Sequence, residues 1–257
     1  MKKLIELYVY ANLHVAFAAM SMVVITGQLL NCVLGAELPI FVFVLTFMGY
    51  TYTRGNLYLF NKNTSIIILL GMLVVFCPIF IYRILNPISY GLIFLTILLT
   101  MFYLTPYSQR GLRNIPRIKI YIVSLCWVLI THLLPVIEVG YPIDNQMLIL
   151  GIQRFVLVVL LLLVFDIVDL HQDEQKLQTV PHQLGVYRTK VIAIILLVVS
   201  FVLLLFVNSD FYKILINSMM SIVLLFFILF SSPFKSKMYT LFWLEAVPIV
   251  WALLLLI

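Results

Sequence analysis

Charged residues are scarce in this chain of 257 residues, and their scarcity excludes an ordinary soluble domain. Only 10% of the residues are charged, whereas 64% are hydrophobic and the mean hydropathy is +1.17. Soluble domains contain about a quarter charged residues and about half apolar residues. The composition therefore predicts a membrane protein.

Cysteine is also rare, which excludes further classes of protein. Cys32, Cys77 and Cys126 are odd in number, far apart, and located in or beside apolar segments. This pattern supports neither a disulfide framework nor a cysteine metal site. We interpret the three residues as small core side chains.

The chain is rich instead in long apolar runs separated by short polar stretches. About 17 to 25 apolar residues suffice to span a bilayer as a helix. The predicted spans are residues 8–30, 38–58, 64–82, 88–105, 119–137, 147–168, 190–207, 211–230 and 239–257. Because the connections are short, we expect an all-α polytopic membrane protein with about nine transmembrane helices. Residues 1–257 would form one domain in the lipid bilayer.

The basic residues predict the orientation of these spans. If the N-terminus is cytoplasmic, 13 of the 16 Lys and Arg residues lie on the inner side. Positive residues favour that side, so we expect an inner or cytoplasmic membrane protein with its C-terminus outside. The net charge of +6 follows from this topology and predicts no nucleic-acid partner. The inner residues are Lys2, Lys3, Arg54, Lys62, Arg110, Arg113, Arg117, Lys119, Lys176, Arg188, Lys190, Lys235 and Lys237.

Three aspartates follow the sixth apolar run. On a helix, Asp166, Asp169 and Asp173 would lie within roughly 60° of one another and form an acidic stripe. Such a stripe is unfavourable without a cation or a basic partner, and carboxylate oxygens suit Mg²⁺. The pattern therefore favours a metal site, a bound diphosphate or a neighbouring basic residue. The alternative is that the aspartates only solvate the end of a helix.

Basic residues on the same predicted side are candidates for binding phosphate. The connection after the fourth span carries Arg110, Arg113 and Lys119, and guanidinium groups suit phosphate oxygens. After the sixth span, the segment KLQTVPHQLGVYRTK begins at Lys176 and has the Pro and Gly of a loop. Both segments are also typical of basic anchors at the membrane edge.

Taken together, nine spans, an aspartate motif after the sixth and a conspicuous loop after the fourth resemble the UbiA superfamily of intramembrane prenyltransferases. The resemblance covers essentially the full chain. Its most specific element is Asp169-x-x-x-Asp173, which looks like the family's second aspartate-rich motif. Further matching elements are Thr179, Leu184-Gly185, Tyr103-x-x-Pro106, LRNIPRIKIY and Glu245 within FWLEAVPI.

The resemblance implies a bundle of two four-helix groups and a ninth helix around a cavity open to lipid. It implies an enzyme that transfers a prenyl group from a polyprenyl diphosphate to a lipophilic acceptor with Mg²⁺. By the resemblance, Asp166, Asp169 and Asp173 would bind the metal. Arg110, Arg113, Lys119, Lys176, Arg54 and Asn56 would bind the diphosphate, with Tyr103 and Glu245 as further site residues.

The chain departs from the family's first aspartate-rich motif. The corresponding stretch, YTYTRGNLYLFNKNT, contains Arg54, Asn56 and Lys62 but no acidic residue, and no carboxylate occurs between Glu37 and Glu138. A standard site with two acidic motifs therefore cannot form. Either the basic residues replace one metal's charge, or they only cap helices and anchor a loop.

Two other classes of function remain open. The missing first motif favours a non-catalytic protein of the same fold that binds an isoprenoid or a partner protein. A secondary transporter would need ionisable groups near the bilayer centre. His14, His132 and Arg154 come nearest to that requirement, and lone histidines in spans are more often hydrogen-bonded packing residues. Nothing in the sequence predicts the oligomeric state.

Overall fold

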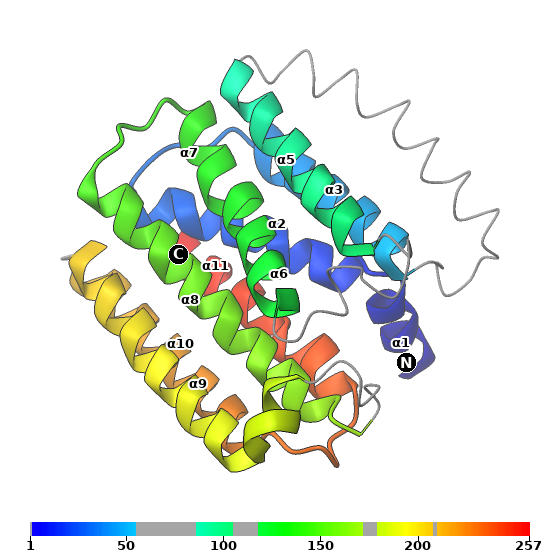
Figure 1. Ribbon diagram of the computed structural model, residues 1–257. Helices are drawn as coiled ribbons and strands as arrows, with labels where there is room; N and C mark the ends of the chain where they lie inside the picture. Colours follow the sequence, from blue (N-terminus) through cyan, green and yellow to red (C-terminus); the bar gives the residue numbers. More distant parts are fainter. Residues whose placement is uncertain (1, 55–85, 105–117, 172–178, 208–209) are drawn as a thin grey trace.

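A computed structural model describes residues 2–54, 86–104, 118–171, 179–207 and 210–257, except for the side chains of Lys2, Arg54 and residues 102–104. These described parts form helices joined by short connections and contain no strand. In chain order the helices are α1 (Lys2–Tyr10), α2 (Leu13–Leu29), α3 (Glu37–Arg54), α5 (Pro87–Leu104), α6 (Ile118–Val128), η2 (Leu129–Leu133), α7 (Leu134–Glu138), α8 (Asn145–Val168), α9 (Val180–Val207), α10 (Phe211–Phe230), η4 (Tyr239–Leu244) and α11 (Ala246–Leu256). Figure 1 shows them packed as one helical bundle.

Five helical segments are long and apolar enough to cross a membrane. At 1.5 Å per residue, a helix of about 20 residues spans the hydrocarbon core of a bilayer. A sixth crossing is possible if α1 and α2, which are bent by 62° relative to each other, count as one. The five segments are Ile118–Glu138, Asn145–Val168, Val180–Val207, Phe211–Phe230 and Tyr239–Leu256. These helices support the prediction of an integral membrane protein.

Eight of the nine predicted spans coincide with helices, and the span at 64–82 lies outside the described residues. The agreement is closest for α10, which has the predicted bounds of 211–230. The first predicted span is interrupted, because Asn12 adopts a left-handed conformation between α1 and α2. Two further apolar helices, Glu37–Thr53 and Pro87–Met101, are shorter than the five long ones. The count of nine spans stays a prediction.

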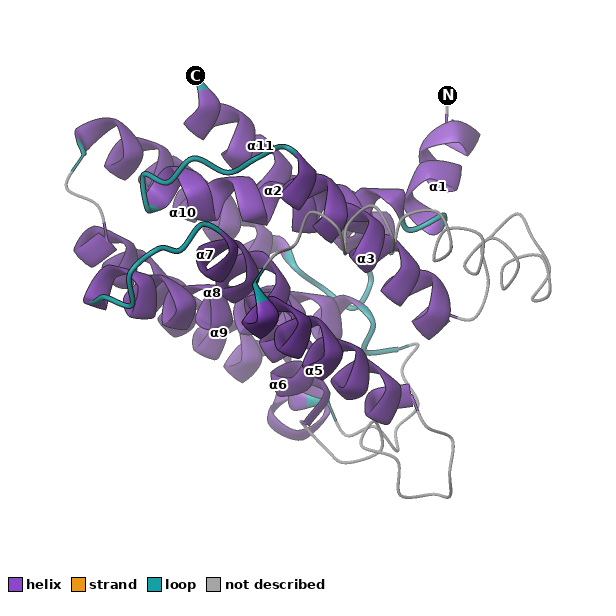
Figure 2. Ribbon diagram, turned by 90° about the horizontal axis from the view of Figure 1, so that it is seen from above, coloured by secondary structure: helices purple, strands orange, loops and turns teal. Residues whose placement is uncertain are grey.

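Small residues allow α2 to occupy a central position. Ala16, Ala18 and Ala19 are almost completely buried, and α2 packs against α3, α11 and η2. A Cβ atom at Gly27 would lie 2.8 Å from the Leu34 side chain, so a larger residue there would displace Leu34. Small residues of this kind let membrane helices approach closely. Figure 2 shows the resulting layers of helices from above.

The outer helices present apolar side chains away from the core. On α9 and α10, Val198, Phe206, Ile222 and Phe226 are all exposed. On α8, by contrast, Leu150, Leu160 and Val164 are fully buried, and α8 packs against both α9 and α6. An exposed surface this apolar is unusual for a soluble monomer and suits contact with lipid.

Two of the membrane-length helical segments contain a π-helical turn. The turn η2 joins α6 to α7 within one continuous span, and η4 precedes α11. Such turns widen the helix by one residue and frequently occur at functional sites. Buried polar groups accompany both turns, because η2 carries Thr131 and His132 and the Phe242 carbonyl of η4 lies 2.8 Å from Nε2 of His14.

Candidate functional site

The last turn of α8 buries a carboxylate at the end of an apolar span. Asp166 is only 2% exposed and lies three residues before the C-cap, Asp169. Transfer of an unpaired carboxylate out of water is costly, so a buried one requires hydrogen bonds or a cation. The surroundings of Asp166 therefore indicate what this end of the bundle can do.

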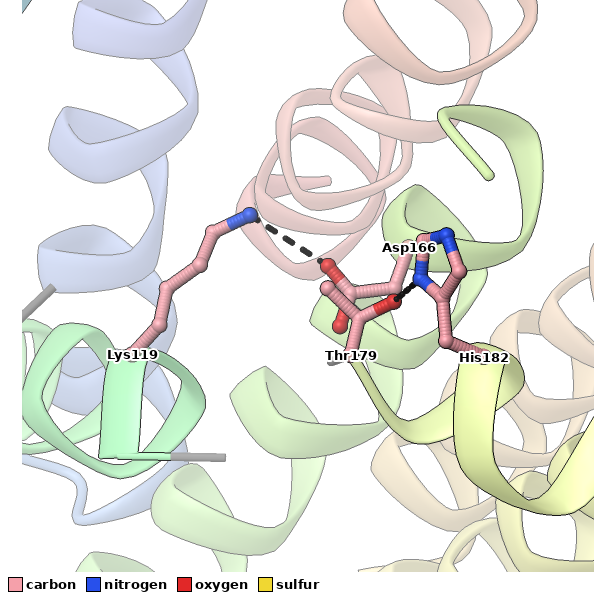
Figure 3. Close-up of polar contacts among 4 residues, drawn as sticks. All are labelled: Lys119, Asp166, Thr179 and His182. Carbon is pink, nitrogen blue, oxygen red and sulfur yellow. Dashed lines mark hydrogen bonds and ion pairs between the residues drawn. The ribbon is translucent and has the colours of Figure 1, made fainter. Parts of the chain in front are cut away.

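Lys119 at the start of α6 supplies a cation to Asp166. Its Nζ atom lies 3.3 Å from Oδ1 of Asp166, and the Lys119 side chain is 30% exposed (Figure 3). The two residues are 47 positions apart in the chain, and the packing of α6 against α8 brings them together. The sequence predicts that Asp166 binds the metal and that Lys119 binds the diphosphate. The structure shows that they contact each other.

The start of α9 contributes two more polar groups at this end. The hydroxyl of Thr179 and Nδ1 of His182 lie 2.7 Å apart, and Thr179 is 5% exposed (Figure 3). Helix α9 begins at Val180 and is kinked at Gly185, whose φ of 78° is readily accessible only to glycine. The segment predicted as a loop before the seventh span is therefore helical from Val180 onward, except at Gly185, where the helix breaks. The proline at 181 suits the first turn of a helix.

Only part of the expected acidic stripe lies within the described residues. Helix α8 ends at Val168, so Asp166 belongs to its last turn and Asp169 is its C-cap. A metal site formed by all three aspartates stays a prediction. Negative charges are unfavourable at the C-terminal end of a helix dipole, which disfavours extending the helix through further aspartates. Asp173 itself lies outside the described residues. Within the described part of the chain, no group of three His, Cys, Asp or Glu residues is arranged to hold a metal ion.

Most of the predicted diphosphate ligands fall outside the part of the chain that the structure describes. Arg54 ends α3 and Tyr103 lies in the last turn of α5, and their side chains are not among those described. Glu245 lies at the junction of η4 and α11, where its amide donates a hydrogen bond to the Thr240 carbonyl over 3.1 Å. Asn56, Arg110, Arg113 and Lys176 are not described.

The two buried histidines are hydrogen-bonded, as expected for packing residues. Nε2 of His14 lies 2.8 Å from the Phe242 carbonyl oxygen, and Nδ1 lies 3.1 Å from the Tyr8 hydroxyl. Nε2 of His132 lies 2.9 Å from the Met147 carbonyl oxygen. A carbonyl only accepts hydrogen bonds, so the Nε2 atom of each ring carries a hydrogen.

Arg154, which is not among the predicted site residues, is fully buried inside the bundle. The guanidinium bonds to α2 and to Thr131 of η2. A lone arginine within an apolar run is a signal for such a site. Its partners could not be predicted, because they depend on how three helices rotate against one another.

Comparison with known proteins adds no family assignment. No protein-family model, no curated protein and no solved structure matches this chain. The relationship to the UbiA superfamily therefore remains a prediction from the quoted motifs.

Proposed function

We propose that this protein is a UbiA-like membrane enzyme that transfers a prenyl group from a polyprenyl diphosphate to a lipophilic acceptor. One observation carries the proposal: a carboxylate, Asp166, is buried at the end of an apolar span and is paired with Lys119 from another span. Ionisable groups in membrane segments are costly and typically functional. A diphosphate bound with a metal ion needs both kinds of group, because carboxylates bind the metal and basic side chains bind the phosphate oxygens.

The described residues partly fit a magnesium ion. Asp166 and Asp169 offer the hard carboxylate oxygens that Mg²⁺ prefers, and Mg²⁺ commonly takes one or two carboxylates, with phosphate and water completing its shell. Asp173 would be the third carboxylate. When bound, the metal would neutralise charge on the departing diphosphate.

The residues around this position would have distinct tasks. Lys119 contacts and orients the Asp166 carboxylate while the site is empty of substrate. The Lys119 side chain is 30% exposed, which would let its ammonium group also reach a diphosphate oxygen. Lys119 can thus move from the Asp166 carboxylate to the diphosphate. A metal ion that arrives with the diphosphate would then balance the buried charge of Asp166.

A non-catalytic protein that binds an isoprenoid or a partner protein is the second candidate. The ion pair itself favours it, because Lys119 already balances the charge of Asp166 without any metal. The absence of a carboxylate between Glu37 and Glu138 points the same way. Metal-dependent release of pyrophosphate distinguishes the two candidates.

The test uses purified full-length protein in lipid nanodiscs with polyprenyl diphosphates of several chain lengths. We expect release of pyrophosphate that depends on Mg²⁺ and decreases strongly in Asp169→Asn. The matched control is Asp210→Asn, because Asp210 caps α10 through the Tyr212 amide and asparagine caps a helix equally well. Binding of the diphosphate without pyrophosphate release in the wild type would favour the non-catalytic candidate.

A further inference from the structure

Arg154 is a buried charge well away from the aspartates of α8. Its side chain is 1% exposed, and 14 residues separate it from Val168, the end of the helix. That interval corresponds to about 21 Å along the helix axis. Arg154 therefore belongs to a different level of the bundle, and its role does not depend on the proposed prenyl transfer.

Every hydrogen-bond partner of Arg154 is electrically neutral. Nη1 donates to the Met22 carbonyl over 2.9 Å and to Oγ1 of Thr131 over 3.3 Å. Nη2 donates to Oγ1 of Thr26 over 3.1 Å. No carboxylate among the described residues lies within ion-pair distance of the guanidinium. Dipoles of neutral groups thus offset only part of the cost of burying this charge.

One edge of the guanidinium has no hydrogen-bond partner at one of its atoms. The Nε atom is buried, and no described residue accepts a hydrogen bond from it. Nη2 has two hydrogens and makes a single hydrogen bond. Nε–H and Nη2–H together form the side-on edge that binds a carboxylate through two parallel hydrogen bonds.

His132 adds a second unused polar atom between the same helices. The residue is completely buried, and its Nδ1 atom has no partner. Because Nε2 carries the hydrogen that bonds to Met147, Nδ1 of the neutral ring is an acceptor. The ring packs over Gly151, where a Cβ atom would lie 3.1 Å from its Cδ2 and Nε2 atoms. Gly151 and Arg154 are three residues apart and share a face of α8.

The neutral partners of Arg154 are themselves held in place. The Thr26 hydroxyl bonds to the Thr131 carbonyl over 2.8 Å, and the Thr131 hydroxyl bonds to the Trp127 carbonyl over 2.6 Å. The π-helical turn η2 supplies Thr131 to this network. The guanidinium is therefore held by hydrogen bonds from α2 and η2.

We propose that Arg154 and His132 form a binding site for a carboxylate within the bundle. The carboxylate would accept hydrogen bonds from Nε–H and Nη2–H of Arg154 and balance its charge. A hydroxyl or water accompanying it would donate to Nδ1 of His132. A single guanidinium in apolar surroundings matches one negative charge, whereas a diphosphate needs several cations or a metal.

The carboxylate can come from two sources. An amphiphile such as a fatty acid would approach through the bilayer, and a small carboxylate would approach through water. Both offer the same group to Arg154, so the test includes both. Neither source requires the protein to be a prenyltransferase.

The test measures quenching of tryptophan fluorescence by dibromostearic acid, using the full chain in phosphatidylcholine nanodiscs. The Trp127 carbonyl accepts a hydrogen bond from Thr131, a partner of Arg154, so we expect a bromine atom bound nearby to quench Trp127. We expect saturable quenching by the acid, and weaker, unsaturable quenching by dibromostearyl alcohol, which has no carboxylate. Competition by unlabelled stearate identifies a bilayer source, and competition by millimolar propionate identifies a water-soluble one.

Substitutions test whether binding of the acid depends on the charge of Arg154. Arg154→Met should raise the concentration of dibromostearic acid at half-saturation at least about tenfold, because a charge-assisted bidentate pair is lost. The matched control is Gln153→Met, since Gln153 is equally buried but bonds to Ser200 over 2.9 Å. Equal affinity in Arg154→Met and wild type would overturn the proposal. Identical quenching by acid and alcohol in the wild type would also overturn it. That result would leave an internal water as the only occupant of the site. The comparison uses the wild type alone, so it does not depend on a variant that folds.

Discussion

Individual residues at the end of α8 show how a membrane bundle tolerates ionisable groups. Asp166 is buried against Lys119, which keeps part of its length in contact with solvent. Lysine is well suited to this position, because its apolar stem can lie among helices while the ammonium group reaches the surface. The pair lets a carboxylate stay inside the protein near the membrane edge.

Removing one partner of this pair should destabilise the protein. Lys119→Met is expected to lower the free energy of unfolding by about 1 to 3 kcal/mol, because the buried carboxylate loses a charged hydrogen-bond partner. Removing both charges in Lys119→Met/Asp166→Leu should recover part of that loss, since the uncompensated carboxylate is then absent. Unfolding by SDS in mixed micelles compares the wild type, Lys119→Met, Asp166→Leu and the double variant. If the double variant loses the sum of the two single effects, the pair contributes nothing as a pair.

The helices themselves are bounded by local chemistry. The Asp144 side chain accepts a hydrogen bond from the Met147 amide over 2.8 Å at the start of α8, and Asp210 does the same at α10 through Tyr212. Gly185 changes the direction of α9, and the Thr189 hydroxyl bonds back to its carbonyl over 2.8 Å. Polar residues beside apolar runs therefore define where each helix starts or bends.

Loss of the cap on α8 tests this conclusion. Asp144→Ala should reduce the free energy of unfolding by about 1 kcal/mol, because the amide of Met147 loses its side-chain acceptor. Asp144→Asn should remain close to the wild type, since asparagine is an equally good N-cap. The same SDS unfolding measurement compares the variants. Equal loss in both would mean that the carboxylate acts through its charge and not as a cap.

At the scale of the whole molecule, four of the described basic residues lie at one end of the bundle. The end of α8, the start of α9 and the segment between α10 and η4 lie at the same end in Figure 1, and the α7–α8 connection lies at the other. Lys119, Lys190, Lys235 and Lys237 belong to the first end, whereas Lys213 lies at the start of α10 beside Asn31. Positive residues favour the cytoplasmic side, and the cytoplasmic N-terminus stays a prediction.

Cysteine labelling tests that topology. In a variant without the three native cysteines, Ser236→Cys should be protected from an impermeant maleimide in intact cells and should react after permeabilisation. Ser236 is exposed in the connection before η4, so burial would not explain the protection. Ile143→Cys, at a position 82% exposed on the opposite end, should react in intact cells. The reverse pattern would invert the orientation, and labelling at Gln109 and Gln178 extends the test to loops outside the described residues.

The sequence by itself determined the class of this protein and the position of most helices. Apolar length is a local property, so the spans could be predicted without knowing what packs against them. The partner of a buried polar side chain, by contrast, often lies far away in the sequence. Only the tertiary structure decided that Lys119 pairs with Asp166 across 47 residues and that Arg154 meets Thr26 across 128. Such contacts depend on the rotation and depth of each helix in the bundle, and the apolar pattern constrains these weakly because lipid and protein interior are similarly apolar.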